Sequence, residues 1–222
     1  MKQSFFLTCA FSVLITASSS GQSINTGIKI GLNFATVNQY TNGTNPQSIT
    51  TFNAGVFAKF SLLDLLALQP EILYTVKGFK DSYLPEGVPT GSHFPPENIT
   101  VTTNISYLEI PILLKLNDPS SSQSIIKPNV FAGPEISFKL NAKQKSETTG
   151  QPSYEQDQTD INSTDLGIIF GIGAEINLPF ATIMIDLRYD LGMRSVDKAL
   201  ESAQNPSIMK NRVVSLNAGI EI

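Results

Sequence analysis

The sequence predicts an all-β protein that folds as an eight-stranded antiparallel up-and-down β-barrel. Three observations lead to this fold class. Apolar and polar residues alternate with a period of two in about eight stretches of the chain. The connections between these stretches are alternately long and short, and the charges within the stretches fall almost entirely on one of the two faces.

The stretch "YLEIPILLKL" (107–116) illustrates the alternation. As a helix it would carry Glu109 and Lys115 on different faces of an otherwise apolar cylinder. As a strand it places successive side chains on opposite faces, so that one face is wholly aliphatic and the other carries both charges. The same sorting recurs along the rest of the chain. The other predicted strands are 27–36, 51–62, 66–78, 129–141, 165–178, 182–194 and 213–222.

The connections strengthen the prediction. The long ones cover about 39–50, 81–98, 142–163 and 195–209, and they are rich in Asn, Ser, Thr, Gln, Gly and Pro. The shorter ones cover 62–65, 117–125 and the region near 177–180. Both termini fall on the short-turn side. This layout is typical of a transmembrane barrel with long extracellular loops and short periplasmic turns, and a soluble sandwich has no reason to keep it.

The charges indicate which face meets lipid. One face carries seven acidic and seven basic residues, whereas the other is aliphatic over a length that crosses a bilayer. In a membrane barrel the charges fill the interior and pair there. The predicted interior polar network consists of Lys29, Glu71, Lys77, Glu109, Lys115, Glu135, Lys139, Glu175, Asp186, Arg188, Asp190, Arg194 and Glu221. The predicted lipid-facing residues are Leu108, Ile110, Ile112, Leu114, Ile168, Phe170, Ile172, Ile183, Ile185, Leu187, Leu216 and Ile220.

The N-terminal segment predicts export. Lys2 is followed by an apolar stretch at about 5–15 and then by small residues, which is the layout of a cleaved signal peptide covering 1–21. The barrel domain then covers 22–222. Cys9, the single cysteine, lies inside this segment; a lipoprotein signal is the alternative, but the apolar run continues past Cys9. A cysteine-free mature chain fits an envelope protein of a Gram-negative bacterium. No later stretch has the roughly 18 consecutive apolar residues of a spanning helix.

Residues suited to catalysis or metal binding are few. His93, the single histidine, follows Ser92 in a Gly/Pro-rich loop, where a solvated histidine is the simpler interpretation than a hydrolase pair or a metal ligand. The acidic stretch with Glu155, Asp157, Asp160 and Asp165 lacks the spacing of a calcium-binding EF-hand loop. Paired carboxylates on the charged face, such as those of 109 and 135, fit a salt-bridge network better than a catalytic pair. We expect no catalytic, cofactor or metal site, and the net charge of -4 argues against a nucleic-acid partner.

Seven motifs, taken in order, resemble the PorT-like outer-membrane β-barrel family of Bacteroidetes. They are "GIKIGLNFA", "LQPEILYTVKG", "YLEIPILLKL", "FAGPEISF", "DLGIIFGIGAEI", "IDLRYDLGM" and "KNRVVSLNAGIEI". The resemblance covers nearly the whole mature chain and implies an eight-stranded barrel in the outer membrane, made with a signal peptide. PorT itself is associated with type IX secretion, which the resemblance offers as a role. The chain departs from outer-membrane barrels in ending at Ile222 rather than at an aromatic residue.

These features favour a non-enzymatic outer-membrane protein that acts as a structural or interaction protein through its loops. Its expected partners are outer-membrane lipid, the barrel-insertion machinery and an envelope protein. Eight strands leave an interior that side chains fill, so we do not expect a solute pore. One alternative is a soluble periplasmic, lipocalin-like barrel in which the aliphatic face would line a cavity for an apolar ligand. Another is an outer-membrane enzyme that acts on lipid.

Overall fold

A computed structural model describes residues 24–38, 46–63, 65–83, 99–118, 124–148, 152–198 and 209–222. The predicted signal peptide at 1–21, including Cys9, and the loop with Ser92 and His93 lie outside the described residues. Nine strands are present within these ranges. Their bounds are β1 Ile24–Asn38, β2 Ile49–Leu63, β3 Leu66–Tyr83, β4 Ile99–Asn117, β5 Ile126–Thr148, β6 Tyr154–Asp157, β7 Thr164–Asn177, β8 Thr182–Gly192 and β9 Lys210–Glu221.

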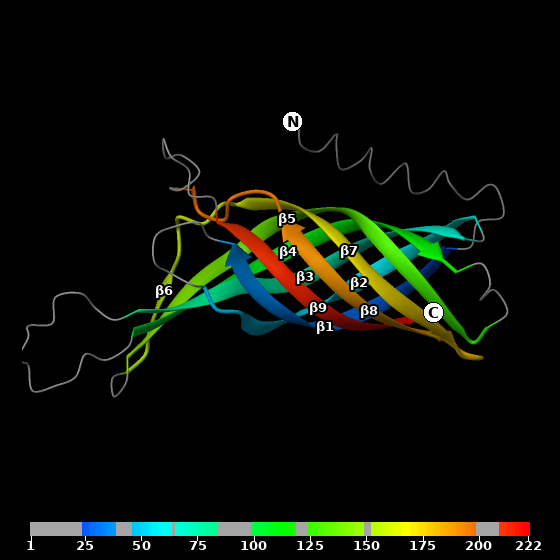
Figure 1. The fold of residues 1–222 in the computed structure, drawn as a ribbon, viewed down its shortest axis with the longest axis horizontal. Coiled ribbons are helices and arrows are strands. Elements are labelled where there is room, and N and C mark those ends of the chain that lie inside the picture. The colour runs from blue at the N-terminus through cyan, green and yellow to red at the C-terminus, as the bar shows by residue number, and fades with distance from the viewer. Residues whose placement is uncertain are drawn as a thin grey trace, which may run out of the picture.

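Eight of the strands close into a ring in which every pairing is antiparallel. The sheet order is β4-β3-β2-β1-β9-β8-β7-β5, and β4 also pairs with β5. The first strand therefore pairs with the last, and the barrel has no free edge within the ring (Figure 1). The prediction of an eight-stranded, up-and-down antiparallel barrel is confirmed. No helix of the described residues is long and apolar enough to cross a membrane.

Short and long connections lie at opposite ends of the barrel. The short ones join Leu63 to Leu66, Asn117 to Ile126, and Asn177 to Thr182. The other four connections of the eight-stranded ring are longer, and one of them contains β6. The C-terminus lies at the short-turn end beside the start of β1, where the Ile222 amide donates to the Thr26 carbonyl at 2.9 Å. We call these two ends the turn end and the loop end.

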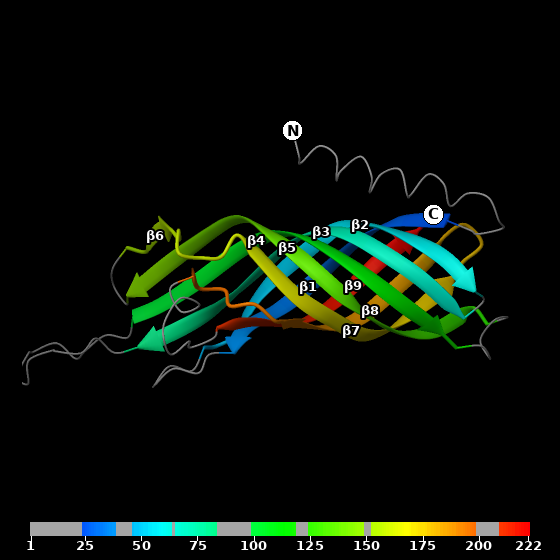
Figure 2. The same ribbon diagram turned by 90° about the horizontal axis from the view of Figure 1, so that it is seen from above.

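The predicted connection at 142–163 is wrong in part. β5 continues to Thr148, and β6 pairs with its extension, with Lys143 opposite Asp157 and Ser146 opposite Tyr154. β3 and β4 continue alongside, so that these strands run past the ends of the others at the loop end (Figure 2). We call the extensions of β3, β4 and β5 together with β6 the blade. In β6 and in the extension of β5 most residues are polar on both faces, so the sequence pattern did not reveal these two segments.

The outer wall of the barrel is apolar, and its interior is charged. Along β1 the exposed fraction is 60% at Ile28 and 64% at Ile30, whereas it is 1% at Lys29 between them. Of the twelve residues predicted to face lipid, nine are exposed, and the other three, Leu108, Ile110 and Ile220, are half-buried on the same outward register. Soluble proteins rarely expose continuous apolar surface on this scale, so this wall is built for a non-aqueous environment.

Glycines on the inward register make room for aromatic rings. A β-carbon at Gly171 would collide with the Phe131 ring and with the Leu187 carbonyl oxygen, and Phe131 packs with Leu113 and Ile169 in the core of the barrel. In the narrow interior of an eight-stranded barrel, glycines therefore lie next to large aromatic side chains.

Gly171→Ala is expected to lower the free energy of unfolding by about 1–3 kcal/mol, because the added methyl group overpacks the interior. Urea titration of the protein refolded in lipid vesicles measures this change. Gly219→Ala is the matched control, since its β-carbon would come no closer than 3.0 Å to the Ile28 carbonyl oxygen and 3.5 Å to the Phe57 ring. Equal losses in the two variants would contradict the role assigned to Gly171.

Candidate functional site

Twelve charged residues inside the barrel form three clusters, and none of the twelve is more than 8% exposed. The turn-end cluster consists of Lys59, Lys115, Glu175 and Glu221. The central cluster consists of Lys29, Glu71, Asp186 and Arg188. The loop-end cluster consists of Lys77, Glu109, Glu135 and Asp190.

The turn-end cluster contains two ammonium groups and two carboxylates. Lys59 Nζ lies 3.0 Å from Glu175 Oε2 and 2.6 Å from Glu221 Oε2, and Lys115 Nζ lies 3.1 Å from Glu175 Oε1. The Asn25 amide donates a further hydrogen bond of 2.5 Å to Glu221. The four charges balance, as buried charges must if they are not to be costly.

The central cluster is balanced as well and has the densest hydrogen bonding. The Arg188 guanidinium donates two hydrogen bonds, of 2.8 and 2.7 Å, to the two oxygens of Glu71. Lys29 Nζ lies 2.9 Å from Glu71 Oε1 and 2.7 Å from Asp186 Oδ2, and Arg188 Nη2 lies 3.0 Å from the same oxygen of Asp186. Gln69 donates to Glu71 at 2.6 Å. Such bidentate, charge-assisted contacts are among the strongest hydrogen bonds in proteins, and they fix the arginine in one orientation.

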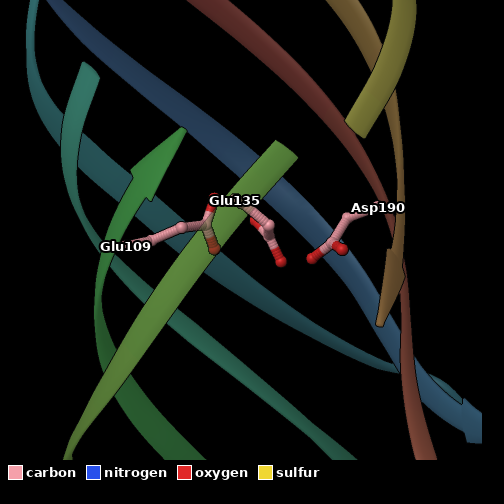
Figure 3. A group of neighbouring side chains, drawn as sticks. All are labelled: Glu109, Glu135 and Asp190. Atoms are coloured by element: carbon pink, nitrogen blue, oxygen red, sulfur yellow. The ribbon is translucent and has the colours of Figure 1, made fainter. Parts of the chain in front are cut away.

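The loop-end cluster is unbalanced, because one ammonium group faces three carboxylates. Lys77 Nζ lies 2.9 Å from Glu109 Oε2 and 3.0 Å from Glu135 Oε1, and it also donates to Asp190 Oδ2. One oxygen from each of the three acids lies within 4.8 Å of the others. Figure 3 shows the three carboxylates converging from different strands. The carboxyl groups of this cluster therefore outnumber its cations by two.

Aromatic rings lie next to the cations of all three clusters. Lys29 Nζ lies 5.4 Å from the centroid of the Phe57 ring, and Lys77 Nζ lies 5.9 Å from that of Tyr107. The centroid of the Phe131 ring lies 5.3 Å from Arg188 Cζ and 5.9 Å from Lys115 Nζ. This ring therefore contacts both the central cluster and the turn-end cluster. These are distances at which cation–π attraction contributes to stability.

The structure brings together eleven of the thirteen residues predicted for the interior network. The other two are half-buried at the loop end, outside the clusters. Lys139 Nζ donates to the Ile161 carbonyl at 2.8 Å, and Arg194 donates to Thr164 Oγ1 at 2.5 Å. The predicted network left out Lys59, although it is the seventh basic residue counted on the charged face, and it left out the rings of Phe57, Tyr107 and Phe131. Each of these lies on the inward register of its strand, so the register was the signal that could have identified them.

An apolar cluster lies above the loop-end charges. It consists of Val37, Phe79, Ile105, Tyr107, Ala142, Ile161, Val196 and Met209, all buried. Val196, whose amide donates to the Met209 carbonyl at 2.7 Å, belongs to the chain that follows β8, so this chain folds inward over the barrel. The cluster separates the loop-end charges from the solvent beyond the rim.

The acidic residues considered for calcium near the loop end do not come together. Glu155 pairs with Lys143 at 2.5 Å on the exposed face of the blade. Asp165 is buried in the barrel, where it accepts a hydrogen bond of 2.7 Å from the Asn211 amide. Among the described residues, the triad of Glu109, Glu135 and Asp190 is the group of acids that could hold a metal ion.

Residues 17–198 match the family described as outer membrane protein beta-barrel domain. The chain belongs to this family. The match runs through β8 and ends before β9, the strand that closes the ring against β1. No curated protein sequence matches the chain.

Solved structures of outer-membrane proteins are similar to the chain. The attachment invasion locus protein Ail of Yersinia pestis is 16% identical, with 89% of this chain and 98% of that chain covered and a TM-score of 0.42. Neisserial surface protein A is 15% identical, with 91% and 99% covered and a TM-score of 0.47. OprG from Pseudomonas aeruginosa is 10% identical, with 91% and 96% covered and a TM-score of 0.47.

The charge balance within the clusters predicts different effects on stability for two aspartates of β8. Asp186→Asn is expected to lower the free energy of unfolding by about 3–5 kcal/mol, because it leaves two cations of the central cluster with one carboxylate. Asp190→Asn is expected to leave the free energy of unfolding unchanged or to raise it, because it removes one of the unbalanced negative charges. Urea titration of each variant in lipid vesicles measures the two free energies of unfolding, and EDTA is present to remove divalent cations. A loss for Asp190→Asn as large as that for Asp186→Asn would contradict the imbalance.

Proposed function

We propose that the chain is an integral outer-membrane barrel without catalytic activity, which presents the blade and its long loops outside the cell. The observation that carries this proposal is the inverted distribution of side chains, with aliphatic residues on the outer wall and paired charges inside. A wall of this kind is stable against lipid hydrocarbon, and an even number of strands with alternating connections is typical of bacterial barrels. The twelve outward residues named above then contact lipid, and the turn end faces the periplasm after export by the signal peptide.

The blade and the loops supply the surface for interaction. β5 and β6 form an open, polar extension, on which Lys143 pairs with Glu155 and Lys145 pairs with Glu147 at 2.6 Å, all exposed. The charged barrel beneath is filled by side chains and acts as a rigid base. The partner that we propose is another envelope protein, while the insertion machinery meets the chain only during assembly.

The narrower proposal is a PorT-like role as an accessory of type IX secretion, supported by the seven sequence motifs. A lipocalin-like role is disfavoured by the direction of the side chains. An apolar ligand would need the aliphatic register inside, whereas Lys29 is 1% exposed and Ile30 is 64% exposed.

Two single-cysteine variants test the location and the orientation together. Glu147→Cys lies on the blade, and Phe180→Cys lies at a short turn, where the phenylalanine is 80% exposed. A membrane-impermeant maleimide is expected to label the first on intact cells, and the second only after the outer membrane is permeabilised. The only natural cysteine, Cys9, falls within the predicted signal peptide and Cys9→Ser removes it in both variants. Equal labelling of both variants on intact cells would contradict the orientation.

A change of gel mobility on heating tests membrane residence by itself. We expect the protein in the outer-membrane fraction, with a different mobility in unheated detergent than after boiling, because a lipid-facing barrel stays folded in detergent. Recovery from the soluble periplasm would overturn the proposal and favour the ligand-binding alternative.

A further inference from the structure

Two cations face outward at the loop end of β9. Lys210 and Arg212 occupy the outward register of this strand, directly above the apolar side chains that follow on the same register. Arg212 Nη1 donates to the Gly192 carbonyl at 2.9 Å and to the Asn211 carbonyl at 2.7 Å. Backbone atoms therefore hold the guanidinium at the rim of the outer wall, where the apolar band ends.

The charges of Lys210 and Arg212 are not neutralised by the part of the chain that the structure describes. Neither side chain forms an ion pair there, and the two carbonyls that accept from Arg212 carry no formal charge. The blade differs, because Lys143 and Lys145 are each paired with a glutamate. The outward face of β9 therefore presents net positive charge at the upper edge of the wall.

A hollow in the outer wall lies farther down the same strand, where β9 meets β1. Its volume is about 620 Å³. Ala54 and Ala218 lie on either side of Ile30 in the register, so two short side chains leave space beside a long one. Leu32 and Leu216 also line the hollow, which is apolar over almost all of its surface. This shape and chemistry suit a segment of hydrocarbon chain.

The hollow lies about one leaflet below the two cations. Arg212 and Ala218 are six positions apart on β9, which is about 20 Å along the strand and about 15 Å along the membrane normal at a tilt of about 40°. The hydrocarbon core of a bilayer is about 30 Å thick, so the chains of one leaflet reach about 15 Å into it. A lipid with its head group at Arg212 therefore has the end of an acyl chain at the level of the hollow.

The combination of cations and hollow selects an anionic lipid. Arginine binds phosphate through paired hydrogen bonds, and each lysine or arginine at a membrane surface attracts anionic head groups. A free phosphate ion would engage the cations and leave the hollow empty, whereas an uncharged lipid would fill the hollow and leave the cations unpaired. A lipid with a phosphate head group satisfies both features at once.

We propose that one outer-leaflet lipid with a phosphate head group binds over the seam between β1 and β9. Its phosphate lies on Lys210 and Arg212, and one acyl chain lies in the hollow between Ala54 and Ala218. The inference rests on the proposed function, because it requires the outer wall in lipid and the loop end outside the cell. The bound lipid covers the two strands whose pairing closes the ring.

Native mass spectrometry of the protein refolded in detergent tests the site with three probes. Dimyristoyl phosphatidic acid carries both the phosphate and the chains, dimyristoylglycerol lacks the phosphate, and inorganic phosphate lacks the chains. We expect one molecule of the phosphatidic acid to be retained per chain, much weaker retention of dimyristoylglycerol, and no retention of inorganic phosphate.

Variants separate the two halves of the site. Lys210→Gln combined with Arg212→Gln is expected to weaken binding of the phosphatidic acid about thirtyfold, because two cations that attract the head group are lost. Ala218→Phe is expected to weaken it about tenfold, because the ring fills the hollow. The matched controls are Lys143→Gln, at an ion-paired lysine of the blade, and Ala132→Phe, at an outward alanine of β5. Both are expected to leave binding unchanged.

The gel-mobility shift on heating verifies that each variant is folded. Equal retention of the phosphatidic acid and dimyristoylglycerol would overturn the lipid site, as would retention of inorganic phosphate alone. Unchanged binding in the double variant or in Ala218→Phe would overturn it too. Recovery of the unmodified protein from the soluble periplasm would instead overturn the proposed function, whereas a heat-modifiable outer-membrane barrel that retains no phosphatidic acid overturns the lipid site alone.

Discussion

Replacing Arg188 by methionine is expected to lower the free energy of unfolding by about 3–5 kcal/mol, because it breaks a buried ion-pair network by removing one partner. Glu71 loses both guanidinium hydrogen bonds, and Lys29 remains as the single cation of the central cluster between two carboxylates. Phe131 also loses the cation above its ring. Methionine keeps much of the length of the arginine, so the loss reports charge and hydrogen bonding more than volume. Urea titration in lipid vesicles measures the change.

A second substitution distinguishes charge balance from lost packing. Asp186→Asn combined with Arg188→Met leaves Lys29 paired with Glu71 and restores neutrality. The double variant is therefore expected to lose less stability than the sum of the two single variants, with an interaction energy of about 0.5–3 kcal/mol. Strict additivity, or a loss for Arg188→Met below about 1 kcal/mol, would show that the central cluster contributes little to stability.

Leu187→Arg is expected to cost about 2–4 kcal/mol and to lower the yield of inserted protein, because it places a charge on the proposed lipid-facing wall near the middle of β8. Leu187 is 46% exposed and lies between Ile172 and Leu216 in the register, so no carboxylate is opposite it on this wall. The fraction that folds into vesicles and its resistance to urea measure the effect.

The matched control is Leu63→Arg. Leu63 is 68% exposed but lies at the end of β2, beside a short turn, where the charge can reach the aqueous interface. Its expected cost is about 0–1 kcal/mol. If both arginines cost the same, the depth of β8 in the bilayer would differ from the one proposed, and if neither has a cost the wall would not face lipid.

The sequence by itself determined the fold class and the face on which each side chain lies. In a strand the direction of a side chain depends only on whether its position is odd or even, so local alternation separates Lys29 from Ile30 without knowledge of any partner strand. The same rule placed eleven of the thirteen network residues in the interior. The rule gave no signal for β6, because this strand forms in a polar stretch without an apolar face.

Only the tertiary structure decided which charges meet. Lys29 pairs with Asp186, a residue 157 positions away, because β1 closes the ring through β9 onto β8. The stagger between strands sets the height of each charge along the barrel axis, and it depends on the pairing of every strand at once. The charged face carries seven acidic and seven basic residues, but the structure distributes them unevenly. Two clusters are neutral, and in the loop-end cluster three carboxylates share a single lysine.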